Sequence, residues 1–178
     1  LLLGIGRHTP EKRWPCVIDA VARVAAKRPV GLVLIGNGHQ QASVIEHVNG
    51  NPHIQLLEPI RNRTALATIM ASCDALVHGS SAETFGLVAS EALASGLPLV
   101  LPNAGAVADI AHQDFSEAYV PGNAHDAASA IERLLDRDQH QLRSAAHHAA
   151  MTARTLDEHF TELFQTYADA ISEKREAA

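Results

Sequence analysis

Short apolar runs recur along the chain at intervals that suit the strands of a buried sheet. Glycine, proline or polar residues bound each run, and runs of this length favour strands that are covered on both faces. The pattern predicts six strands, at residues 1–5, 30–35, 53–57, 74–78, 97–101 and 117–120.

The segments between these strands carry apolar residues at the spacing of amphipathic helices. Pro15 suits the first turn of the first helix. Thr155 with Glu158 predicts a capping box at the start of the last one. The pattern predicts helices over residues 15–27, 40–48, 64–71, 86–95, 106–111, 123–135, 139–153 and 157–170.

Strands and helices therefore alternate, with short connections, before a run of helices ends the chain. Such alternation predicts an α/β fold with a doubly wound, Rossmann-like parallel sheet of about six strands. We expect residues 1–153 to form this domain and residues 154–178 to add a C-terminal helix. Ligands of these sheets bind beyond the carboxyl ends of the strands. The conspicuous polar loops follow those ends, at residues 6–7, 36–38, 58–60 and 79–86.

Composition narrows the class of protein. The 178 residues include 14 basic and 20 acidic side chains, and the net charge of −6 argues against broad binding to nucleic acid or membrane surfaces. No apolar run approaches the length of a membrane span. Cys16 and Cys73 form no C-x-x-C pair, which favours a reduced, cytoplasmic setting. Because the chain starts without Met at a core strand, we expect a fragment of a longer protein.

Residues 78–98 are the stretch around which the chain is organised. They predict a strand end, a tight polar loop, a helix from Gly86 and a stop at Gly96 and Pro98. Free amides and the helix dipole at such a loop favour an anion such as phosphate. Glu83 and Glu91 would lie about 12 Å apart if the segment were helical throughout. That separation suits a nucleotide-sugar, which has hydroxyls at both ends and a diphosphate between them.

The two glutamates also have plainer interpretations. They could be a loop acid and an exposed helix acid, or the paired carboxylates of a glycosidase, which usually come from separate elements. Glu91 lies among Ala, Leu, Val and Ser residues, so we expect it to be buried, and a buried carboxylate needs partners.

Several basic and glycine residues elsewhere in the chain could either bind a ligand or have a purely structural role. Arg7 and Lys12 could hold a diphosphate or belong to a solvated charged loop. The Gly36-Asn-Gly38 loop could admit a phosphate or be an ordinary turn. Gln41 stands where the dinucleotide fingerprint needs a further glycine, which argues against NAD binding. His78 could contact a ligand or merely cap its strand.

No motif for metal or nucleophilic chemistry emerges from the 11 histidines and two cysteines. They form no H-E-x-x-H and no Cys/His cluster. His147 and His148 are interpreted as surface residues, and so are Asp136 and Asp138. The serines after His78 lack the G-x-S-x-G elbow of a hydrolase. We therefore expect neither a metal nor another cofactor.

Four motifs in order resemble one family, the retaining glycosyltransferases of the GT-B fold in family GT4. The residues Glu83-Thr-Phe-Gly86, Glu91-Ala-Leu-Ala-Ser-Gly96 and Leu97-Pro98 resemble its E-x-F-G…E-A-x-A-x-G-x-P signature. Its G-R…E-K segment, G-x-G loop and small-residue turn resemble Gly6 to Lys12, Gly36 to Gly38 and Asn103 to Gly105. The resemblance covers nearly the whole chain and implies the C-terminal, donor-binding half of a GT-B enzyme.

The resemblance also implies roles for individual residues. Arg7 and Lys12 would bind the donor's diphosphate, and Glu83 would bond hydroxyls of the transferred sugar; these three are the implied catalytic residues. Glu91 would hold the ribose, and the backbone near Ile60 would face the base. The implied donor-binding residues are Gly6, Gly38, Ile60, His78, Thr84, Phe85, Gly86, Leu87 and Glu91.

The implied activity is a metal-independent hexosyl transfer from a UDP-, GDP- or ADP-sugar. The acceptor, a glycan, lipid or small molecule, would bind a missing N-terminal domain, on which the last helix would pack. The full-length protein would be cytoplasmic, or peripheral to the inner membrane. Two other functions stay open: a non-catalytic nucleotide-sugar-binding module, and a GT-B epimerase that would act on the donor without an acceptor.

Overall fold

A computed structural model describes residues 1–153 and 156–176, and it contains one six-stranded, wholly parallel sheet. The strand order is β3-β2-β1-β4-β5-β6. The predicted strands are all present, with ends shifted by one or two residues. The strands are β1 (Leu2–Ile5), β2 (Leu32–Ile35), β3 (Ile54–Leu57), β4 (Ala75–Val77), β5 (Leu99–Pro102) and β6 (Ser116–Tyr119).

Helices follow the strands as the periodicity predicts. The N-caps are Asn62, Asn123 and Asp138, whose side-chain oxygens accept bonds from the first backbone amides of α3, α6 and α7. The capping box predicted at Thr155 lies outside the described residues. The helices are η1 (Pro10–Lys12), α1 (Trp14–Ala25), α2 (Gln41–Val48), α3 (Arg63–Ser72), α4 (Leu87–Ala94), α5 (Ala106–Ile110), α6 (Ala124–Leu135), α7 (Gln139–Thr152) and α8 (Leu156–Glu176).

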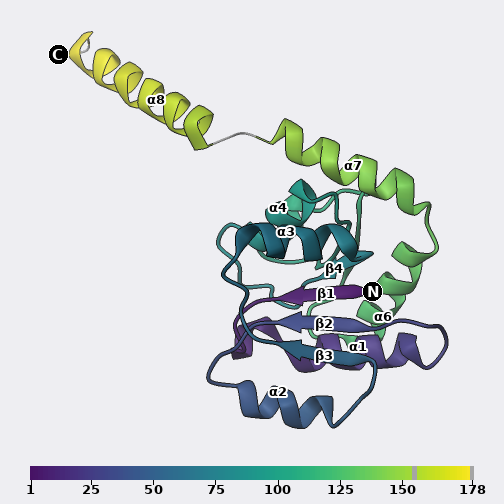
Figure 1. The fold of residues 1–178 in the computed structure, drawn as a ribbon. Helices are drawn as coiled ribbons and strands as arrows, with labels where there is room; N and C mark the ends of the chain where they lie inside the picture. The colour runs from purple at the N-terminus through teal and green to yellow at the C-terminus, as the bar shows by residue number, and fades with distance from the viewer. Residues whose placement is uncertain (154–155, 177–178) are drawn as a thin grey trace.

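The helices cover both faces of the sheet (Figure 1). One apolar layer joins α1, α2 and α6 to the strands, with Trp14 and Ile131 among its buried side chains. The other joins α3, α4, α5 and α7, with Met70 and Leu93 among its members. Successive residues of β1, Leu2 and Leu3, enter opposite layers, as the alternation of a strand requires. The double cover explains why the four inner strands are apolar throughout, whereas the edge strands β3 and β6 also carry polar residues.

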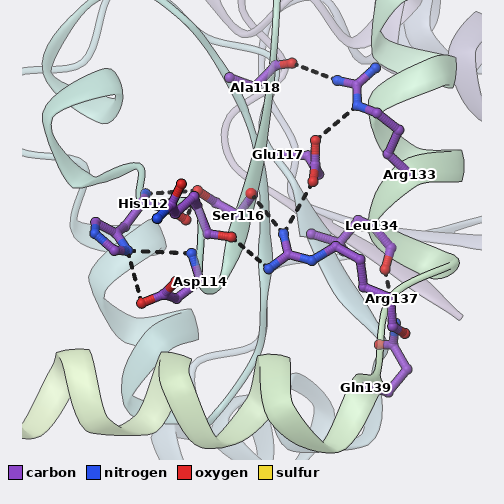
Figure 2. Close-up of polar contacts among 10 residues, drawn as sticks. His112, Asp114, Ser116, Glu117, Ala118, Arg133, Leu134, Arg137 and Gln139 are labelled. Carbon is purple, nitrogen blue, oxygen red and sulfur yellow. Dashed lines mark hydrogen bonds and ion pairs between the residues drawn. The ribbon is translucent and has the colours of Figure 1, made fainter.

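A polar network fastens the edge strand β6 to α6 (Figure 2). The Glu117 carboxylate accepts a bond of 2.9 Å from Arg133 Nε and one of 3.1 Å from Arg137 Nη1. Arg133 and Arg137 also donate to the carbonyl oxygens of Ala118 and Ser116. These bonds fix the side of the sheet that lies farthest from β3.

The chain reverses direction across the sheet between β1 and β4. From β1 the connections run outward to β2 and β3, and the chain then returns to place β4 on the other side of β1. The carboxyl ends at such a reversal leave a crevice, which is where doubly wound sheets bind their ligands. The loops that contain Gly6 and His78 follow the two strands at this point.

Candidate functional site

Three residues from separate segments meet beyond the carboxyl ends of β1 and β4. The Lys12 ammonium, at the end of η1, forms an ion pair with Glu83 Oε1 in the loop before α4. His78 Nε2 lies 3.3 Å from the same carboxylate oxygen. The exposed fractions of the side chains are 12% for Lys12, 19% for Glu83 and 2% for His78. The structure thus joins Lys12 and Glu83, which are 71 positions apart in the sequence.

Close backbone packing holds these residues in place. A Cβ atom added to Gly79 would lie 2.2 Å from the Lys12 carbonyl oxygen, so only glycine allows the two segments to approach this closely. The backbone N–H of His78 donates to the Val100 carbonyl, and the Tyr119 hydroxyl donates to the His78 carbonyl at 2.6 Å. The end of β4 is therefore anchored to both β5 and β6.

The His78 imidazole is neutral at physiological pH. Burial, and to a lesser extent the nearby Lys12 ammonium, lower the pKa of His78 to about 4, although the Glu83 carboxylate opposes the shift. A neutral imidazole carries one N–H donor and one lone pair. His78 Nε2 makes no aligned hydrogen bond despite its short distance to Glu83.

The start of α4 presents unpaired amides beside this cluster. Gly86 is the N-cap residue, and within residues 1–153 and 156–176 no acceptor faces the amides of Phe85, Gly86 or Leu87. Thr84, Phe85 and Leu87 have exposed side chains, and Phe85 reaches 75%. Free amides at a helix N-terminus can donate hydrogen bonds to an anion. The sequence analysis predicts such an anion site for this loop.

A narrow hollow of about 170 Å³ lies next to the loop that follows β1. Gly6 and Arg7 line one side and Ile60 lines another, together with Pro59 and Leu66. Its lining is mostly apolar, which suits the face of a flat ring. The Arg7 guanidinium lies 3.6 Å from Glu11 and is 78% exposed, so it is free to turn toward a ligand. It forms no hydrogen bond or ion pair with Glu83, which pairs with Lys12 instead.

The Gly36-Asn37-Gly38 loop closes the hollow from the end of β2. A Cβ atom on Gly38 would lie 2.6 Å from the His8 carbonyl oxygen. His8 N–H donates to the Asn37 carbonyl at 2.8 Å. These contacts make Gly38 necessary for the packing of two loops, whether or not a phosphate also approaches it.

Glu91 corrects one expectation. Its side chain is exposed and lines a second hollow of about 480 Å³ between α3 and α4, with Arg63 and Met70. Leu66 lines both hollows, so Glu91 lies beside the ring-sized one and not in the Lys12 cluster. The expected distance of about 12 Å between Glu83 and Glu91 assumed a continuous helix. That condition is not met, because α4 begins only at Leu87.

Several contributing residues escaped the sequence reasoning. Gly79 was interpreted only as part of a turn, and Tyr119 only as part of the last predicted strand. Asn37 lines the ring-sized hollow and donates to the Glu58 carboxylate at 3.1 Å. A polar residue between two glycines at a strand end was the available signal for Asn37. The contacts of Gly79 and Tyr119 depend on distant segments and left no local signal.

Two further properties concern the described residues as a whole. They contain no group of three or more His, Cys, Asp or Glu side chains placed to hold a metal ion. None of their helices combines the length and the apolar character needed to cross a membrane.

Comparison with known proteins places the chain in a family. The family model of the glycosyl transferases group 1 matches residues 1–151. A curated relative is the GDP-mannose-dependent alpha-(1-6)-phosphatidylinositol dimannoside mannosyltransferase of Mycobacterium tuberculosis. It is 32% identical over 84% of this chain and 39% of its own length. The chain spans between 26% and 40% of the length of the curated relatives that it matches.

Solved structures share the fold. Anabaena HepE, in complex with UDP, has a TM-score of 0.76 at 22% identity, over 97% of this chain and 48% of that one. The C-terminal domain of a group 1 glycosyl transferase (LpcC) from Francisella tularensis has a TM-score of 0.74 at 20% identity, over 87% of this chain and 86% of that one. The named relatives are glycosyltransferases, which does not favour a non-catalytic module or an epimerase. The chain belongs to the glycosyl transferases group 1 family, and its fold is that of a GT-B glycosyltransferase domain.

Proposed function

We propose that this chain is the C-terminal, donor-binding domain of a retaining hexosyltransferase. A nucleoside-diphosphate sugar would lie along the carboxyl edge of the sheet, across the reversal between β1 and β4. The observation that carries the proposal is the convergence of Lys12, Glu83 and the free amides at the start of α4 in that crevice. Cations, acceptors for hydroxyls and backbone donors are the groups that a sugar diphosphate needs.

Each end of the donor has a suitable surface. The base would enter the hollow beside Ile60, whose apolar walls fit a flat heterocycle. The ribose would meet Glu91, which lines the adjoining hollow and accepts hydroxyl donors. The sugar would bond to Glu83, and the diphosphate would draw on Lys12, Arg7 and the amides of Phe85 to Leu87. The UDP in the Anabaena complex and the GDP-mannose in the name of the mycobacterial relative support a nucleotide donor without fixing its base.

The chemistry follows from charge development. When the bond between sugar and diphosphate breaks, negative charge grows on the departing diphosphate. Preorganised cations and amides lower the energy of that state. Lys12 and Arg7 supply two positive charges, so we propose that the transfer needs neither a metal nor another cofactor.

The acceptor, a glycan, lipid or small molecule, would bind an N-terminal domain in a cytoplasmic full-length protein. The last helix supports this arrangement. Figure 1 shows α8 projecting away from the layered body. One face of α8 carries apolar side chains that are 48% to 64% exposed and lie at helical spacing: Phe160, Phe164, Tyr167 and Ile171. We propose that this stripe packs on the N-terminal domain. The 178-residue chain alone should therefore bind donor weakly and transfer nothing, and turnover by it would refute this division of labour.

Titration calorimetry with UDP, GDP and ADP tests donor binding. One of the three should bind the 178-residue chain. Lys12→Ala and Glu91→Ala should each weaken that binding about tenfold or more, the loss expected for a hydrogen bond to a charged group. Lys27→Ala is the matched control, because Lys27 pairs with Glu132 on the surface. Failure of all three nucleotides to bind would overturn the proposal, and unchanged affinity in both site variants would remove the assignment of residues.

A further inference from the structure

His78 presents a buried polar atom without a hydrogen-bond partner. Its Nε2 is fully enclosed and lies 3.3 Å from Glu83 Oε1, but not in the alignment of a hydrogen bond. A buried donor or acceptor left unpaired costs about 1–3 kcal/mol, and native structures rarely leave one without a reason. The reason would be a partner that another state of the protein supplies.

The ligand-free ion pair shows what must change when a donor binds. Lys12 and Glu83 neutralise each other in this structure. A donor that takes Lys12 to its diphosphate would leave Glu83 without its cation. The side chain of Glu83 is mostly buried, so it would need a replacement donor close by. His78 Nε2 already lies beside the same carboxylate oxygen.

We propose that His78 is a positioning residue that takes over Glu83 when Lys12 turns to the diphosphate of the donor. A small rotation of the carboxylate would align Oε1 with the Nε2–H of the neutral imidazole. The second carboxylate oxygen would then point toward the sugar. This inference rests on the proposed function, because the donor is what separates Lys12 from Glu83.

The surroundings of His78 suit this exchange. Its backbone cannot follow the side chain, because the Tyr119 hydroxyl and the Val100 carbonyl hold it on either side. The charged groups that influence the imidazole are Lys12 from η1 and Glu83 from the loop before α4. The phenol of Tyr119 stays neutral, because burial raises its pKa. Loss of Lys12 alone therefore leaves His78 facing a single carboxylate.

A ligand-free experiment isolates the exchange. Lys12→Met removes the ammonium and keeps the length of the side chain, so it imitates the departure of Lys12. NMR titration of the His78 ring should show its pKa rising by about one unit or more, because an opposite charge then dominates. Lys27→Met is the control and should leave the titration unchanged. An unchanged pKa of His78 in Lys12→Met would overturn the inference, even if nucleotides bind as proposed.

A second experiment uses the donor. His78→Gln keeps an N–H near the position of Nε2, whereas His78→Leu removes it. Calorimetry with the preferred nucleoside diphosphate first gives the reference affinity of each variant. The extra affinity that the wild type shows for the corresponding nucleotide-sugar should survive in His78→Gln and fall about tenfold in His78→Leu. Equal sugar-dependent affinity in both variants would contradict the role of His78. Absence of nucleotide binding in wild type would contradict the proposed function itself.

Discussion

Removing the Lys12 ammonium should destabilise the fold measurably. The two partners of this ion pair are 12% and 19% exposed, so Lys12→Met would leave the Glu83 carboxylate mostly buried beside a neutral imidazole. Breaking a fully buried pair costs about 3–5 kcal/mol. Partial exposure and the neighbouring His78 reduce this, and we expect a loss of about 2 kcal/mol in the free energy of unfolding. For a chain of this length that corresponds to a fall of about 4–8 °C in Tm.

A double-mutant cycle separates the pair from its surroundings. Glu83→Gln removes the charge of the partner, and the double variant should be more stable than the two single losses imply, by at least about 1 kcal/mol. Urea unfolding followed by circular dichroism supplies the free energies. Lys27→Met breaks an exposed pair with Glu132 and should cost less than about 0.5 kcal/mol. Additive single effects would refute the coupling of Lys12 and Glu83.

Three further changes have defined outcomes. Gly79→Ala should displace η1 from β4, lower Tm and weaken nucleotide binding, because the new Cβ would strike the Lys12 carbonyl; calorimetry that finds native affinity would exclude this close approach. Because the folded-state pKa of His78 lies below its ordinary 6.5, protonation favours the unfolded chain. The free energy of unfolding should therefore fall between pH 6.5 and pH 4, with this residue contributing up to about 3 kcal/mol of the loss. Urea unfolding should show a shallower fall with pH in His78→Leu. Glu117→Gln should lower Tm by loosening the bonds from both of its arginine partners, with nucleotide affinity unchanged; a native Tm would show that the network adds nothing.

The fold was predictable because its signals are local. Strands covered on both faces need apolar residues at nearly every position, and the four inner strands meet this condition. The edge strands β3 and β6 also carry polar residues, but they too lie within two residues of the predicted positions. The ends of the elements were less certain. The prediction for the fourth strand extended through His78, whereas β4 ends at Val77, although the next amide still bonds to the neighbouring strand.

The predicted burial of Glu91 was wrong, and the helical period explains why. The apolar composition around it suggested burial, but composition ignores direction. Ala89, Ala92 and Leu93 form the buried side of α4, and Glu91 projects to nearly the opposite side. Applying the period of 3.6 residues to this segment would have indicated an exposed carboxylate.

The candidate site was predictable in its residue types but not in its contacts. Arg7, Lys12 and Glu83 were recognised from motifs, and the fold does bring their segments to one edge of the sheet. The pairing of Lys12 with Glu83, and the buried Nε2 of His78 beside them, depend on how distant loops pack. The spacing of residues within one segment cannot predict contacts between distant loops.

Mapping the nucleotide on the backbone tests directly whether the donor binds at the carboxyl ends of the strands. The ¹H–¹⁵N NMR spectrum of the 178-residue chain would be recorded during titration with the nucleoside diphosphate that binds it. The shifted amides should cluster at Gly6, Gly38 and residues 84–87, beyond the carboxyl ends of the strands. The amide of Gly31, which precedes β2 at the opposite edge of the sheet, should stay in place. Shifts that gather around Gly31 and leave residues 84–87 unchanged would show that the nucleotide binds elsewhere and would overturn the proposed donor site.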